Sequence, residues 1–203
     1  MNRIIVEVSN YVKKLFETNP SFFRYHNFYH TKEVVDIVED LAENSVISEG
    51  DRELLLIAAW FHDIGYPETI PYHEEKSAEK AEEFLSEKNY PPDKIAAVKK
   101  LILSTKVPQS PENILEQIMC DADIAYIGKK DFMGRINQLR EEWGNTLQKE
   151  FSDADWYNTN IHFLESNSFH TEYAKTRFGQ TRKENLAELR KLLEKEKTNH
   201  NSK

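Results

Sequence analysis

Apolar residues recur three and four positions apart along most of the chain, the spacing that gives a helix one buried face. In the first part of the chain this pattern predicts helices over six ranges: 2–18, about 31–44, 52–63, 74–88, 93–105 and 112–128. Asn19-Pro20 is expected to end the first of them, because a residue before proline disfavours helical backbone. Pro111 is expected to start the last of them, a position that proline tolerates.

Two of these segments are apolar almost all round, as expected of buried helices. Residues 52–63 end in the polar pair His62-Asp63, and a turn at 48–50 is expected before them. Residues 112–128 contain Asp121 and Asp123 among apolar neighbours.

From residue 131 the pattern predicts charged amphipathic helices, the last ending near Glu196 and followed by a frayed tail. No repeat, linker or alternating strand pattern interrupts the chain. The sequence therefore predicts one all-α domain over 1–203, a helical bundle whose C-terminal helices occupy about 131–196.

The composition narrows the classes of partner. Of the 203 residues, 39% are hydrophobic and 31% charged, which is typical of a globular protein. The net charge of −8 disfavours general nucleic-acid binding. Cys120 is the only cysteine, so an internal disulfide and a multi-cysteine zinc site are excluded. No apolar run reaches the roughly 20 residues of a membrane helix, and we expect a cytoplasmic protein without a membrane partner.

Three groups of polar residues stand out against this background: His26 with His30, the pair His62-Asp63, and Asp121 with Asp123. His26 and His30 are four apart and would share one face of a helical turn. His62-Asp63 lies at the end of the most apolar helix, where polar groups need a partner. Each group taken alone also fits a structural role: a loop junction for the histidines, a buried ion pair for His62-Asp63.

Together the three groups offer imidazole and carboxylate ligands without thiolates. Mixed nitrogen and oxygen ligands suit a divalent ion such as Mn, Fe, Co, Ni or Zn, with Mg less natural at histidine. Asp121 and Asp123 are two positions apart, about 200° around a helix, so one site is expected to use only one of them directly. An open metal site of this kind suits hydrolysis, in which the ion activates water and polarises a phosphoryl oxygen.

The ordered motifs resemble the HD superfamily of metal-dependent phosphohydrolases over roughly residues 25–128. The segments that carry the resemblance are YHNFYHTKEVV, AAWFHDIGYP and DADIAYIG. The first also looks like the entry motif of cyclic-nucleotide phosphodiesterases. The C-terminal FHTEYAKTRFGQTRKENLAEL is similar to that of bacterial predicted HD phosphohydrolases.

The resemblance implies the metal ligands His30, His62, Asp63 and Asp123. Asp123 is preferred to Asp121 because the aspartate of the family typically follows a small residue, as Ala122 does here. It implies that His26 protonates the leaving oxygen, although a purely supporting histidine is an equal alternative. Asp63 would also orient the attacking water. One tightly bound divalent ion is expected.

Two further residues are candidate substrate contacts. His73 lies after the central helix, where relatives with two metals carry further histidines, and Lys106 offers a point charge for a phosphate. The expected substrate is a small phosphorylated molecule, a nucleotide in the leading interpretation. A nucleotide sensor without turnover and a bundle whose metal only braces the fold remain the alternatives, and homo-oligomerisation is left open.

Overall fold

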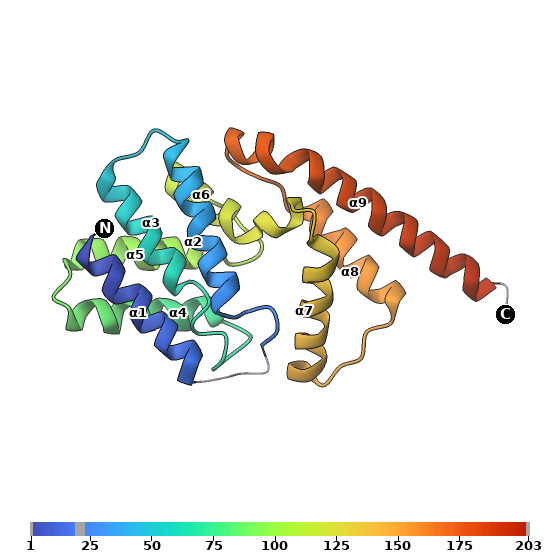
Figure 1. Cartoon of the computed structure of the whole chain (residues 1–203), viewed down its shortest axis with the longest axis horizontal. Coiled ribbons are helices and arrows are strands. Elements are labelled where there is room, and N and C mark those ends of the chain that lie inside the picture. Colours follow the sequence, from blue (N-terminus) through green and yellow to red (C-terminus); the bar gives the residue numbers. More distant parts are fainter. Residues whose placement is uncertain (1, 19–22, 202–203) are drawn as a thin grey trace. The chain divides into compact units, whose positions relative to one another are not determined.

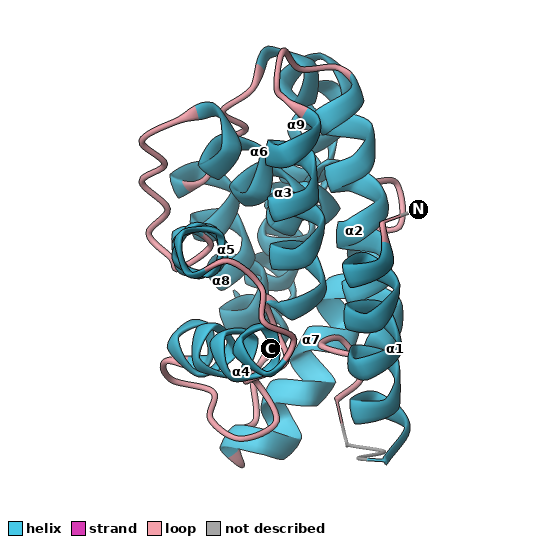
Figure 2. Cartoon of the chain, turned by 90° about the vertical axis from the view of Figure 1, so that its left-hand side faces the viewer, coloured by secondary structure: helices cyan, strands magenta, loops and turns pink. Residues whose placement is uncertain are grey.

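The computed structural model describes residues 2–18 and 23–201, and within these ranges the protein is built of helices without strands (Figures 1 and 2). The all-α prediction is confirmed. The helices are α1 Arg3–Thr18, α2 Phe28–Glu43, α3 Glu49–Phe61, α4 His73–Glu87, α5 Pro92–Ser104, α6 Ile114–Asp123, the 3₁₀ helix η1 Ile124–Gly128, α7 Phe132–Leu147, α8 Asp153–Ser166 and α9 Glu172–Asn201.

The chain divides into two compact units, unit 1 over Met1–Asp123 and unit 2 over Ile124–Lys203. Unit 1 contains every residue predicted to take part in chemistry. The organisation as one domain stays a prediction. Among the described residues, none of the helices combines the length and the apolar character needed to span a membrane.

Helix α3 is the centre of unit 1, as its apolar sequence predicts. It packs against α1, α2, α4, α5 and α6, and its residues from Leu55 to Phe61 are all buried. The predicted bounds were wrong by a few residues, because Ser48 forms a capping box with Asp51 and starts the helix where a turn was expected. The helix ends at Phe61, so His62 and Asp63 project from its C-terminal end.

Helix α2 begins at Phe28, three residues before the predicted start. The cause is Asn27, whose side-chain oxygen accepts hydrogen bonds from the backbone N–H groups of Tyr29 and His30 at 2.9 and 3.1 Å. This N-cap satisfies two donors that a helix end otherwise leaves without partners. It also places His30 in the first turn, on a fixed backbone.

The prediction of one helix over 112–128 was wrong in two respects. Pro111 does not start it. The side chain of Asn113 accepts hydrogen bonds from the N–H groups of Leu115 and Glu116 instead, and α6 begins at Ile114. The α-helix also ends at Asp123, where the backbone tightens into the 3₁₀ helix η1.

In unit 2, η1 packs against α7 and α9, and α8 packs against α9. The side-chain amide of Asn185 on α9 donates to the carbonyl oxygens of Ile127 and Lys129, both at 2.9 Å, which ties the end of η1 to α9. Helix α9 continues to Asn201, so the predicted end near Glu196 was wrong. The predicted stop at Asn19-Pro20 lies outside the described residues.

Candidate metal centre

Three helices of unit 1 bring together side chains that are far apart in the sequence. His30 lies in the first turn of α2, His62 directly follows α3, and Asp123 is the last residue of α6. One ligand atom from each of these three residues lies within 4.8 Å of the other two. A single cation can therefore contact all three.

Asp63 lies against both histidines. Its Oδ2 is 3.3 Å from Nε2 of His30 and 3.1 Å from Nε2 of His62. The same His62 nitrogen lies 3.6 Å from Oδ1 of Asp123. The four residues predicted as ligands thus converge, with His62 at the middle. Asp121 is buried and is not part of the group.

The orientation of the His62 ring indicates what the group is built to hold. Nδ1 lies 2.8 Å from the carbonyl oxygen of Ala59, to which it donates. Nε2 is buried and forms no hydrogen bond, although carboxylate oxygens of Asp63 and Asp123 face it. A bare nitrogen lone pair facing two anionic oxygens is unfavourable, so either a proton or a metal cation belongs there.

The neighbouring charges change the pKa values of both histidines. Burial by itself lowers the pKa of His62, but the negative charges of Asp63 and Asp123 outweigh it and raise this pKa to about 9. For His30 burial dominates and keeps the pKa below its ordinary value, although Asp63 acts in the opposite direction. Burial and the charge of Asp63 together raise the pKa of Asp123. A cation would relieve this crowding of negative charge.

The group is accessible at the side of His73 and Asp123, whose side chains are 21% and 22% exposed. Nε2 of His73 lies 3.6 Å from Oδ1 of Asp63, the oxygen that does not face His30 and His62. A buried cluster with a partly exposed edge leaves access for a small molecule.

His26 also lies close to the group. Its ring stacks on Tyr66 with the centroids 3.7 Å apart and an interplanar angle of 18°. The His26 ring is 5.9 Å from that of His30 and 6.3 Å from that of His73. The structure therefore brings His26 and His73 close to the candidate metal group, which consists of His30, His62, Asp63 and Asp123. Their chemical roles stay predictions.

Lys106 follows α5, and its side chain contacts residues at the start of α4. Its Nζ pairs with Glu75 and lies 5.1 Å from the centroid of the Tyr72 ring. Its contacts are thus with neighbours of His73 in the sequence. The prediction that Lys106 binds a phosphate remains untested.

Sequence reasoning missed Tyr66 and Glu74. Tyr66 contacts His26 and His73, and Glu74 Oε2 lies 3.5 Å from Nδ1 of His73. Nothing in the sequence distinguishes these residues from other polar or aromatic neighbours. Gly65 is the one signal that was available: a Cβ there would lie 2.5 Å from the carbonyl oxygen of His73, so a glycine allows the loop after Asp63 to approach α4.

The family model of the HD domain matches residues 27–125, the range that carries all four predicted ligands. The chain contains an HD domain. HD domains are generally metal-dependent phosphohydrolases, and the group of His30, His62 and Asp123 is suited to hold the ion. Searches of curated proteins and of solved structures found no significant match. The match begins after His26, so the likeness of the YHN stretch to phosphodiesterases stays a prediction.

Proposed function

We propose that this HD domain is a metal-dependent phosphohydrolase that cleaves a phosphoester or phosphoanhydride bond in a nucleotide. The observation that carries the proposal is the buried Nε2 of His62, which faces two carboxylates without a hydrogen bond. His30, His62, Asp63 and Asp123 would hold one divalent ion there. The nitrogen and oxygen donors suit Mn, Fe, Co, Ni or Zn better than Mg.

A bound divalent ion supplies a Lewis acid for the phosphoryl oxygen and lowers the pKa of water. The chain's own residues supply orientation. Since Oδ2 of Asp63 faces His30 and His62, Oδ1 is the oxygen available to orient the attacking water, and His73 lies 3.6 Å from it.

His26 would donate a proton to the leaving oxygen, a task that imidazole side chains commonly perform. The face of Tyr66, 3.7 Å away between centroids, limits the rotation of this ring. His73 would contact the substrate, and Lys106 would supply a positive charge towards its phosphates.

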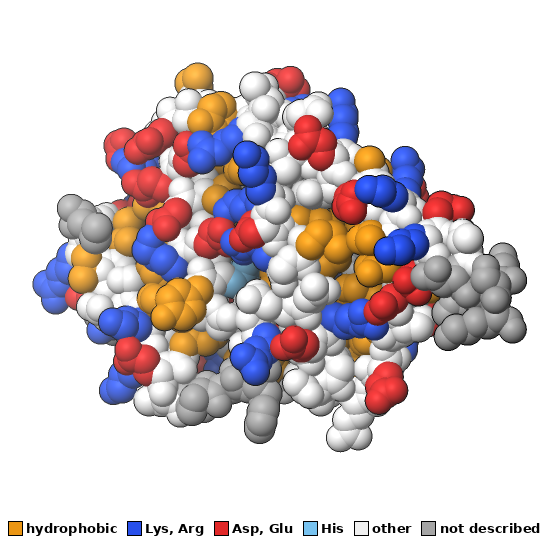
Figure 3. Space-filling view, turned by 45° about the vertical axis from the view of Figure 1, so that its right-hand side comes forward, with side chains coloured by type: hydrophobic (Ala, Val, Ile, Leu, Met, Phe, Trp, Pro, Cys, Tyr) orange, Lys and Arg blue, Asp and Glu red, His pale blue; other side chains and the backbone are white. Residues whose placement is uncertain are grey.

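The proposed substrate is a small anion and not a nucleic-acid polymer. The net charge is −8, and on the face shown in Figure 3 Lys and Arg side chains are interspersed with Asp and Glu. The described residues on that face form no continuous basic track for a phosphate backbone. A cytoplasmic location is part of the same proposal.

The test combines metal analysis with turnover. Protein purified without chelator should contain about one divalent ion per chain, as expected for a single site, and should hydrolyse members of a nucleotide panel with added Mn, Co or Ni. His62→Ala should lose both the metal and the activity.

His162→Ala is the matched control, since this histidine lies on α8 in unit 2 and should leave both unchanged. Tight nucleotide binding without turnover would indicate that the protein is a nucleotide sensor and not an enzyme. A protein that retains no metal, and whose stability Asp63→Ala leaves unchanged, would contradict both.

A further inference from the structure

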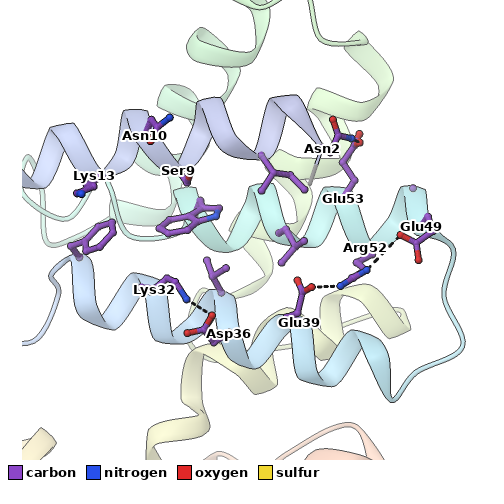
Figure 4. A pocket seen from close by; sticks show the side chains of 16 residues that line it. Asn2, Ser9, Asn10, Lys13, Lys32, Asp36, Glu39, Glu49, Arg52 and Glu53 are labelled. Atoms are coloured by element: carbon purple, nitrogen blue, oxygen red, sulfur yellow. Dashed lines mark hydrogen bonds and ion pairs between the residues drawn. The ribbon is translucent and has the colours of Figure 1, made fainter.

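Unit 1 has a second concave site, a groove between α1 and α2 whose floor is α3 (Figure 4). Its volume is about 1010 Å³, at the upper limit of the roughly 300–1,000 Å³ typical of small-molecule sites. The apolar residues that line it are Ile5, Phe28, Val35, Leu56 and Trp60.

The groove is separate from the metal centre. None of its lining residues belongs to the metal group. Phe28 and Trp60 lie two positions before His30 and His62, and two positions on a helix correspond to about 200°. The start of α2 and the end of α3 therefore present the candidate metal ligands on one side and the groove on the other.

The shape of the groove selects a slender occupant. Val35, Leu56 and Trp60 line it, yet they are only 7%, 7% and 6% exposed. Little of each of these side chains is open to solvent, so the floor offers an occupant only a slot of limited apolar surface. Along α3 the slot runs from Gly50 to Trp60, or about 15 Å at 1.5 Å per residue.

The charges around the groove differ between its two ends, as Figure 4 shows. At the end near Phe28, Lys13 projects from α1 and Lys32 from α2. Among the described residues, each lysine pairs only with a carboxylate four residues further along its own helix, Glu17 for Lys13 and Asp36 for Lys32. Both pairs are exposed, although Asp36 also lines the groove. Exposed pairs of this kind contribute little, so both lysines can turn to an anion.

The opposite end is acidic. Glu39 and Glu49 both pair with Arg52, and Glu53 lies beside them. Lys94 pairs with Glu53 at 3.0 Å, but the three carboxylates still outnumber Arg52 and Lys94, so this end would repel an anion. An anionic group therefore fits only the lysine end.

We propose that this groove binds a single-chain amphiphile with an anionic head group, such as a free fatty-acid carboxylate. The carboxylate lies between Lys13 and Lys32, and the alkyl chain runs over Trp60 and Leu56 towards Gly50. At about 1.2 Å per bond of an extended chain, 15 Å corresponds to a chain of about twelve carbons.

Dodecanoate below its micelle concentration is the probe, and tryptophan fluorescence is the readout. We expect a saturable change in the wild-type protein that disappears in Trp60→Phe, because Trp60 is the tryptophan in the groove. The double variant Lys13→Glu/Lys32→Glu should bind at least about tenfold more weakly by calorimetry, the loss expected for removal of charge-assisted contacts.

Lys14→Glu is the matched control, because Lys14 is an exposed lysine of α1 that does not line the groove, and it should bind as the wild type does. Dodecylamine, with the same chain and a cationic head, should bind more weakly than dodecanoate. No binding of dodecanoate, equal affinity for both amphiphiles, or an unchanged affinity of the double lysine variant would each overturn the proposal. So would binding of an amphipathic helical peptide that dodecanoate does not displace.

Discussion

His30 and His62 are both buried beside Asp63, yet their pKa values shift in opposite directions. Burial keeps the pKa of His30 below its ordinary value, so His30 is neutral above about pH 6.5. The carboxylates raise the pKa of His62 to about 9. In the metal-free protein at neutral pH, His62 therefore carries a proton that a metal ion must displace.

We predict that metal affinity increases with pH between 6.5 and 8.5, by up to about tenfold per unit, because one proton leaves His62 for each ion bound. Above about pH 9 this dependence should end. Competition with a chromophoric chelator measures the affinity, and calorimetry in two buffers counts the protons released. A constant affinity across this range would show that His62 does not exchange a proton for the metal.

Asp121 and Asp123 are separated by one residue but differ in their surroundings. Asp123 belongs to the metal group, whereas Asp121 is fully buried outside it. Asp123→Asn should lower metal affinity by more than about 100-fold, beyond the loss typical of residues that only support ligands. Asp121→Asn should lower the free energy of unfolding while metal is retained. Metal analysis and denaturant unfolding distinguish the two, and the reverse pattern would exchange their roles.

The sequence singled out His62, Asp63 and Asp123 because polar groups among apolar neighbours need a partner. The resemblance to HD domains implied these residues and His30 as ligands, and the structure brings all four together. The sequence did not identify Tyr66, because the stack of this ring on His26 joins the loop after Asp63 to the segment before α2. A contact between residues forty positions apart leaves no trace in local composition.

At the scale of single elements, the N-cap of α2 connects stability with metal binding. Asn27 accepts a hydrogen bond from the backbone of His30 itself. Asn27→Ala should therefore lower the free energy of unfolding by about 0.5–2 kcal/mol and also weaken metal binding. Ser152→Ala removes a comparable N-cap from α8 in unit 2 and should affect stability alone. Equal metal affinity in both variants would show that the cap does not position His30.

Gly65 has a similar role where the loop after Asp63 meets α4. A Cβ there would lie 2.5 Å from the carbonyl oxygen of His73 and 2.7 Å from the backbone nitrogen of Ser77. Backbone atoms cannot move aside as a flexible side chain can, so Gly65→Ala should destabilise the protein and displace His73 from Asp63. Gly179→Ala is the control: nothing lies within 4 Å of its Cβ, and alanine in a helix interior should stabilise by up to about 1 kcal/mol. Thermal unfolding of both variants should show opposite signs.

The helices themselves were predictable from apolar periodicity, while their ends were not. The starts of these helices depend on single polar side chains that cap the first turn, such as Asn27, Ser48 and Asn113. The tightening of α6 into η1 at Ile124 depends on packing that periodicity does not encode.

At the scale of the molecule, a single ion would connect α2, α3 and α6, which are separate in the sequence of unit 1. An ion that binds only the folded chain stabilises it by mass action, by about 2.7 kcal/mol at a free concentration one hundred times Kd. For a chain of this size, each kcal/mol raises Tm by about 2–4 °C. We predict that Mn, Co, Ni or Zn raises the Tm of the chelator-treated protein by about 5–11 °C under that condition, as measured by scanning calorimetry. His62→Ala should show no rise and His162→Ala the full rise, because the effect depends on the group at the end of α3. A rise that persists in His62→Ala would place the stabilising ion elsewhere on the protein.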